Sequence, residues 1–197
     1  MTPAIVAEVR DYVLSRLEKE LSAKLTYHCL AHTRDDVLPA AMRLAKLDSL
    51  GEADTLLLEL GVLFHDFGFV EQRDGHEKIG ARIARTILPT YGITPAELDV
   101  IEGLIMATKL PQSPRTHLEQ LIADADLDVL GRDDFPAINE ALRLEMEAAG
   151  FPSTLDAWYR DQLAFLESHT YFTSVAGTLR NAGKRRNIEG LRERLRA

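Results

Sequence analysis

Residues 56–68 read Leu56-Leu57-Leu58-Glu59-Leu60-Gly61-Val62-Leu63-Phe64-His65-Asp66-Phe67-Gly68 and form the most hydrophobic stretch of the chain. Its apolar residues recur at helical spacing and make a stripe too wide for a surface helix. The run is interrupted by Glu59 and is far shorter than the ~20 residues that a membrane helix needs. The sequence therefore predicts a central, buried helix that ends near Gly68, and no membrane span.

Apolar residues also have helical spacing on both sides of this stretch. Before it we expect a helix over 1–25, capped by Thr2 with Pro3 at the first helical position, and a second helix around 37–45. After it, helices are expected around residues 79–87, 95–108, 113–131, 135–150, 153–171 and 175–195. No segment alternates with period two between turn signals. The prediction is an all-α fold, a compact single-domain helical bundle of about eight or nine helices.

Composition places the chain among globular proteins and limits its partners. It has 197 residues, of which 46% are hydrophobic and 27% charged. The single cysteine, Cys29, rules out a disulfide framework, and Met1-Thr2-Pro3-Ala4 leads directly into a helix pattern, so we expect a cytoplasmic protein. A net charge of −8 argues against a nucleic-acid partner. Composition leaves the oligomeric state open.

The doublet His65-Asp66 is the first candidate for chemistry. An ionised carboxylate at the end of so apolar a run is costly to desolvate unless a cation or hydrogen bonds compensate it. Neighbouring side chains diverge on a regular helix, but at an end that gives way to Gly68 both can turn toward one point. A metal ion at that point would satisfy Asp66.

Two other groups of residues carry possible ligands. His28 and His32 lie four residues apart, which puts both rings on one helical face, although such pairs are more often solvated than metal-bound. Residues 122–131 contain the three carboxylates Asp124, Asp126 and Asp128 within an apolar helix pattern. Periodicity puts Asp126 on the core face and the other two on an edge, so Asp126 is the preferred ligand. The alternative is that all three are surface or capping carboxylates.

These residues resemble the HD-domain superfamily of metal-dependent phosphohydrolases, whose pattern is a histidine, then a His-Asp doublet, then a distant aspartate. The chain has His32 in Ala31-His32-Thr33-Arg34, the doublet His65-Asp66, and an aspartate within Asp124-Ala125-Asp126. The resemblance covers a core of about residues 27–135, with the helix over 1–25 and the helices over 136–197 packed on it. Family alignment can select Asp124, whereas periodicity favours Asp126.

The resemblance implies a metal centre and a reaction. His32, His65, Asp66 and Asp126 would hold one or two divalent ions, and the mixed N and O donors suit Mn²⁺, Fe²⁺, Mg²⁺, Co²⁺ or Ni²⁺. Metal-activated water would then hydrolyse a phosphomonoester or phosphodiester, such as a nucleotide or another small phosphate ester. Asp66 or Asp124 would accept the proton of the attacking water.

Further positions resemble accessory sites of the same family. His76 resembles a histidine that contacts substrate or a second metal, the alternative being a solvated residue in the first turn of a helix. Thr108-Lys109 resembles a position near the phosphate, the alternative being a capping threonine beside an exposed lysine. We expect His76 and Lys109 to assist catalysis. Substrate contacts are expected from His28, Thr108, Lys78 and Arg82.

The competing interpretation is a non-catalytic HD-like regulatory module that binds a nucleotide or a protein. A module that has lost catalysis would be expected to lose ligands, but all four ligand types are present in this chain. The enzyme is therefore the favoured interpretation.

Overall fold

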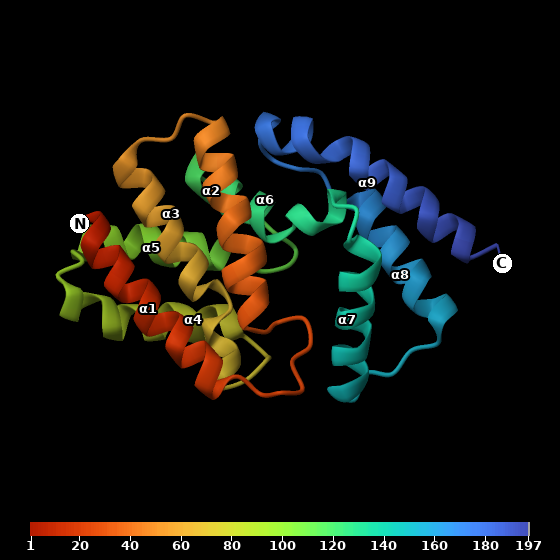
Figure 1. Ribbon diagram of the computed structural model, residues 1–197, viewed down its shortest axis with the longest axis horizontal. Helices are drawn as coiled ribbons and strands as arrows, with labels where there is room; N and C mark the ends of the chain where they lie inside the picture. The colour runs from red at the N-terminus through yellow and green to blue at the C-terminus, as the bar shows by residue number, and fades with distance from the viewer. Residues whose placement is uncertain (197) are drawn as a thin grey trace.

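The central helix expected from the sequence is α3, which spans Glu52–His65 and is buried along most of its length. The computed structural model describes residues 1–196 (Figure 1), and within this range it contains nine α-helices and no strand. The predicted all-α, single-domain bundle is thereby confirmed. Ala197, the last residue of the predicted domain, lies outside the described residues. No helix in residues 1–196 is long and apolar enough to cross a membrane.

The other helices follow in chain order. α1 is Pro3–Glu20, and α2, Leu38–Leu47, is preceded by a π-helical turn η1, His32–Val37. After α3 come the 3-10 turn η2, α4, the 3-10 turn η3 and α5, with bounds Phe67–Val70, His76–Ile87, Leu88–Tyr91 and Pro95–Ala107. The remaining elements are α6, the 3-10 turn η4, α7, α8 and α9, with bounds His117–Asp126, Asp128–Gly131, Phe135–Ala148, Leu155–Ser168 and Ser174–Arg194.

Helix α3 separates two apolar clusters, which explains why its apolar stripe is so wide. On one side, Leu60 and Phe64 pack with residues of α1, α4 and α5. On another side, Leu58 and Val62 pack with residues of α2, α5 and α6. Because both sides of α3 are covered, its C-terminal residues His65 and Asp66 are held inside the protein rather than at its surface.

Helices α7, α8 and α9 lie together on the opposite side of the molecule from α1, α3 and α4 (Figure 1) and have a small apolar cluster of their own. The buried carboxylate of Asp128 in η4 joins the two parts. Its oxygens accept hydrogen bonds from Arg43 of α2 at 2.9 Å and from Arg180 of α9 at 2.7 and 2.8 Å. This carboxylate pairs with guanidinium groups from two helices, so removal of one arginine would take away part of the compensation of a buried acidic group.

Helix α1 is shorter than the predicted helix over 1–25. It ends at Glu20, and Leu21 has an extended conformation. The residues that follow bind α7 instead of continuing the helix, since Thr26 Oγ1 donates to Ala141 O at 2.7 Å and the amide of Tyr27 donates to Glu145 Oε2 at 2.8 Å. The apolar spacing of residues 1–25, which repeats every four residues, could not reveal this contact with a helix more than a hundred residues away.

Candidate metal centre

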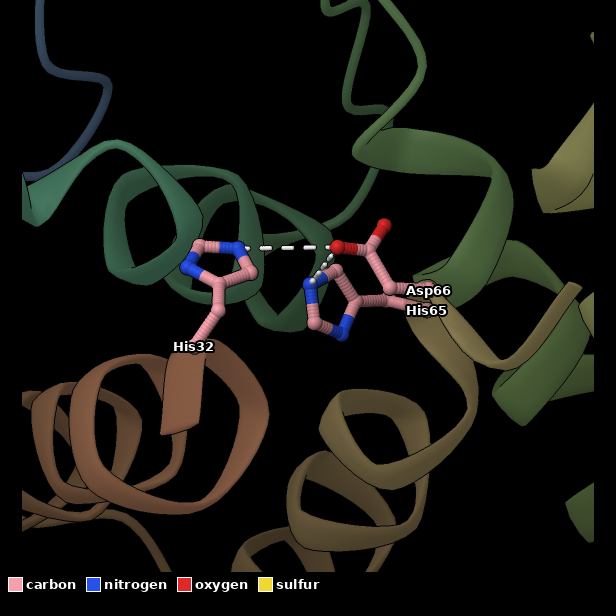
Figure 2. A group of neighbouring side chains, drawn as sticks. All are labelled: His32, His65 and Asp66. Carbon is pink, nitrogen blue, oxygen red and sulfur yellow. Dashed lines mark ion pairs between the residues drawn. The ribbon is translucent and has the colours of Figure 1, made fainter. Parts of the chain in front are cut away.

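His65 is the last residue of α3 and is fully buried. Its Nδ1 atom lies 2.7 Å from the carbonyl oxygen of Val62, one turn earlier in the helix. A carbonyl oxygen can only accept, so Nδ1 carries a proton, and Nε2 is the nitrogen left to interact with the cluster. This hydrogen bond fixes the ring so that Nε2 faces the side chains of His32 and Asp66 (Figure 2).

Asp66 caps α3 with a backbone outside the helical region, φ −104° and ψ 5°, which lets its side chain turn toward that of His65. Its Oδ2 atom lies 3.3 Å from His65 Nε2 and 3.5 Å from Nε2 of His32, which comes from η1 (Figure 2). All three residues are buried, and their donor atoms lie close enough together to hold a metal ion. The cluster predicted from the doublet and from His32 is therefore assembled by the fold.

Asp126 and Asp124, the two alternatives for the last carboxylate, have different surroundings. Asp126 Oδ1 lies 3.5 Å from Nε2 of both His32 and His65, at the end of α6. Both oxygens of Asp124 are instead used by the start of α9, where they accept from the amides of Phe172 and Thr173 at 2.8 Å each and from Thr173 Oγ1 at 2.6 Å. Asp126 thus belongs to the cluster, and Asp124 holds α9 in place.

The donor set fits a divalent metal ion. Within residues 1–196, His65 Nε2 and Asp66 Oδ2 are buried without a hydrogen-bond partner, although buried polar atoms in proteins are nearly always paired. Imidazole nitrogens together with carboxylate oxygens suit the first-row divalent ions and Mg²⁺ better than a closed thiolate zinc site. The two unpaired atoms are those that face each other across the centre of the cluster.

Charges in the cluster stabilise one another. Burial alone would lower the pKa of His65, but the facing carboxylates of Asp66 and Asp126 raise it well above its ordinary value. Burial alone would raise the pKa of Asp66, but His65 and His76 hold it well below its ordinary value. A positive charge at the centre is therefore what these buried carboxylates require.

A cavity of about 430 Å³ opens beside the cluster, within the range of small-molecule sites. Asp66 and Asp126 are among the residues that line it, together with His28, His76 and Thr108. His76 Nε2 lies 3.3 Å from Asp66 Oδ1, the oxygen that does not face His65. The ring of His28 stacks on Phe69 with centroids 4.3 Å apart.

The basic residues expected at the site lie elsewhere. A different arginine, which was not predicted from the sequence, lines the cavity. Lys78 and Arg82 line a separate hollow on α4, where Arg82 pairs with Glu71 at 2.6 Å, and Lys109 lines another hollow beside α5. Arg73, in the loop before α4, is the one arginine or lysine among the described residues that line the cavity. Nothing in its local sequence distinguishes it from a surface arginine.

Glu145 of α7, which was also not predicted from the sequence, positions two residues that line the cavity. Its Oε1 atom accepts from His28 Nδ1 and from Arg73 Nη2, both at 2.6 Å, and its Oε2 atom accepts from the amide of His28 at 2.9 Å. The side chain is 1% exposed. One carboxylate on α7 thus positions both a histidine and an arginine that line the cavity.

The hydrogen bonds of Glu145 predict a pH-dependent stability. Burial would raise its pKa, but the bonds from His28, the Tyr27 amide and Arg73 lower it to about 2. A folded-state pKa below the unfolded value contributes stability that is present above the unfolded value and is lost as the pH falls toward 2. We expect Glu145→Gln to be less stable than wild type by roughly 1–3 kcal/mol at pH 7, and the difference to shrink between about pH 4.5 and 2.

Urea denaturation at several pH values measures this difference. Glu147→Gln, on the same helix but exposed, is the matched control and should follow wild type at every pH. Parallel stability profiles for wild type and Glu145→Gln would contradict the expectation.

Comparison with known proteins adds no relative. No protein-family model matches the chain, and no curated protein matches it significantly.

Proposed function

We propose that this protein is a metal-dependent phosphohydrolase of the HD type. The observation that carries the proposal is the convergence of two histidines and two aspartates, His32, His65, Asp66 and Asp126, from three separate segments onto one buried point beside a cavity. The order of these residues along the chain is the order that the HD-domain pattern requires. A small phosphate ester, rather than a nucleic acid, suits a chain with a net charge of −8, and the single cysteine favours the cytoplasm.

The four side chains would hold a divalent ion, for which Mn²⁺, Fe²⁺, Mg²⁺, Co²⁺ and Ni²⁺ are the candidates. Such an ion lowers the pKa of water and neutralises charge on phosphoryl oxygens, so no nucleophilic serine or cysteine is required. His76 Nε2 and Asp66 Oδ1, 3.3 Å apart, supply further donors on the cavity side of the cluster.

The remaining cavity residues would bind and orient the phosphate group. An anion approaching a chain of net charge −8 is repelled unless the site is locally positive. Arg73 supplies a guanidinium, which Glu145 holds in place at 2.6 Å, and such a group matches phosphate oxygens in a planar, two-point contact. His28 is held through Nδ1 by the same carboxylate, so its Nε2 atom is the one that would meet substrate.

His76 is the residue best suited to move a proton at the cavity. Its Nδ1 atom donates to the carbonyl oxygen of Arg73 at 2.9 Å, so Nε2 is the atom that would exchange a proton with substrate or water. Support for Asp66, rather than Asp124, as a proton acceptor comes from the hydrogen bonds that occupy both oxygens of Asp124.

Metal removal tests the proposal. The protein would be treated with a chelator, dialysed, and assayed with Mn²⁺, Fe²⁺, Mg²⁺, Co²⁺ or Ni²⁺ on nucleoside monophosphates, cyclic nucleotides and simple phosphomonoesters. Turnover is expected to fall at least ~100-fold without metal and to return when a metal is restored, because the ion contributes several kcal/mol of transition-state stabilisation.

Thermal melting of the same samples provides a second measurement. A ligand that binds only the folded state raises its stability, so the melting temperature should rise with metal concentration. Stabilisation by metal without turnover of any ester would favour the regulatory module. If metal neither stabilised the protein nor restored turnover, the metal centre would be rejected.

A further inference from the structure

The cavity beside the cluster is lined by two kinds of residue, which come from different parts of the chain. Among the described residues, its charged side chains all come from residues 27–126, and they are His28, Asp66, Arg73, His76, Glu77 and Asp126. The lining residues of η4, α7 and α8, here called the apolar wall, include Val129, Leu130, Phe135, Ile138, Leu142 and Phe165. Because α7 and α8 lie on the opposite side of the molecule from α3 and α4 (Figure 1), the apolar wall faces the cavity from the side away from those two helices.

The apolar wall offers few hydrogen-bonding groups to a molecule in the cavity. Asn139 and Trp158 belong to it, but they are 5% and 8% exposed, and Asn139 Oδ1 and Trp158 Nε1 have almost no accessible surface. Gln162, which is half-buried, is the remaining polar side chain of the wall within residues 1–196. Hydroxyl groups placed against this wall would lose their hydrogen bonds to water and form few in exchange.

Part of the apolar surface at the cavity is not covered by the protein's own core. Leu142 and Met146 of α7 are half-buried, and Leu110, between α5 and α6, is 53% exposed. All three line the cavity, but none belongs to the three apolar clusters of residues 1–196. Removal of such surface from water is favourable, so an apolar molecule would gain free energy by binding there.

We propose that the substrate is a phosphate monoester whose organic group is a hydrocarbon without hydroxyl groups, bound against the apolar wall while the phosphate lies at the cluster. This inference rests on the proposed function, which brings the phosphate to the cluster, Arg73 and His28. At roughly 30 Å³ for each water-sized group, a cavity of about 430 Å³ holds on the order of fourteen such groups. A phosphate joined to a hydrocarbon of about six to eight carbons fits this volume.

Turnover of unbranched alkyl phosphates by the whole, metal-loaded protein tests the inference. Every member of the series has a primary alcohol as its leaving group, so the members differ in the chain that meets the apolar wall and not in the bond that breaks. We expect kcat/KM to rise about threefold per methylene from ethyl through butyl to hexyl phosphate, because each buried methylene is removed from water. Glucose 6-phosphate is also the ester of a primary alcohol with six carbons, but its hydroxyl groups should make its kcat/KM at least about tenfold lower than that of hexyl phosphate.

Leu142→Asn assigns the preference to the apolar wall. It puts a polar group where Leu142 lines the cavity, so the ratio of kcat/KM for hexyl phosphate to that for ethyl phosphate should fall by about fivefold or more. A ratio measured in one sample does not depend on how much of that sample is folded. Leu142→Met keeps the wall apolar and should keep the wild-type ratio. Leu144→Asn is the matched control and should also keep it, because Leu144 lies on the same helix but is 45% exposed and does not line the cavity.

Calorimetric binding of hexylphosphonate and ethylphosphonate, which have no ester bond to hydrolyse, separates this inference from the proposed function. Tighter binding of hexylphosphonate that is lost in Leu142→Asn, in a protein that hydrolyses none of the esters, would support the hydrocarbon site and reject the phosphohydrolase. Turnover of ethyl phosphate or glucose 6-phosphate equal to that of hexyl phosphate would overturn the hydrocarbon site and leave the phosphohydrolase standing. If no ester were hydrolysed and the two phosphonates bound equally well, both would be overturned.

Discussion

Asp66→Asn is expected to reduce kcat/KM on the order of 10³-fold and to abolish stabilisation of the fold by metal. Asp66 faces three imidazoles, with Oδ2 toward His32 and His65 and Oδ1 toward His76. The amide keeps the shape of the side chain but removes its charge, so an ion bound there would lose a charged ligand and several kcal/mol of its effect on the reaction.

The stability of the metal-free variant should fall together with its activity. Asp66 is 8% exposed, and although burial alone would raise its pKa, the imidazoles of His65 and His76 hold that pKa well below its ordinary value. The ionised carboxylate therefore stabilises the fold at neutral pH. We expect metal-free Asp66→Asn to be less stable than metal-free wild type at pH 7, and the difference to shrink as the pH falls below the ordinary pKa of an aspartate.

Urea denaturation with and without metal, beside the hydrolysis assay, measures both effects. Asp35→Asn is the matched control, since Asp35 lies on the same π-helical turn as His32 but is exposed and paired with Arg34 at 2.8 Å. It should retain both turnover and stabilisation by metal. Full activity in Asp66→Asn would exclude the cluster as the reaction centre.

The sequence predicted those parts of the site that depend on local structure. The cluster contains His65 and Asp66 because an apolar helix that ends near a glycine leaves a histidine and a carboxylate to be satisfied together. The preference for Asp126 over Asp124 agrees with the geometry, but the expected burial was wrong: Asp124 and Asp128, expected on an edge, are 0% and 2% exposed, whereas the side chain of Asp126, expected on the core face, is 16% exposed. Hydrogen bonds from the start of α9 make the burial of Asp124 possible, and helical periodicity carries no information about them.

The site residues that could not be predicted from the sequence are those that contact residues far away in the chain. Arg73 and Glu145 are 72 residues apart in the chain, and His28 and Glu145 are 117 apart. The packing of α7 against the loop after α1 brings them together, and no local pattern encodes that packing.

Gly68→Ala is expected to have the largest effect on folding. Gly68 follows the doublet in η2, and a Cβ atom there would lie 2.0 Å from the carbonyl oxygen of His76 and 2.7 Å from its carbonyl carbon. These are backbone atoms of α4 and cannot move aside as a flexible side chain would. We expect the free energy of unfolding to fall by about 3 kcal/mol or more and the melting temperature by roughly 10 °C.

The same substitution should also weaken the site, because relief of the clash requires α4 to move away from η2. Gly80 of α4 makes a second close approach, with a Cβ position 2.4 Å from the carbonyl oxygen of Phe64, so α4 cannot simply slide along α3. His76, the first residue of α4, would then separate from Asp66, and turnover should fall even where the protein is still folded.

Gly190→Ala is the control for Gly68→Ala, because it makes the same chemical change where the result should have the opposite sign. Gly190 lies within α9, and no atom lies within 4 Å of a Cβ atom built there. Alanine is favoured over glycine inside a helix, so this variant should be more stable than wild type by up to about 1 kcal/mol. Melting temperatures within about 1 °C of wild type for both variants would show that η2 and α4 do not approach as closely as described. A backbone contact this close cannot accept a methyl group without loss of folding free energy.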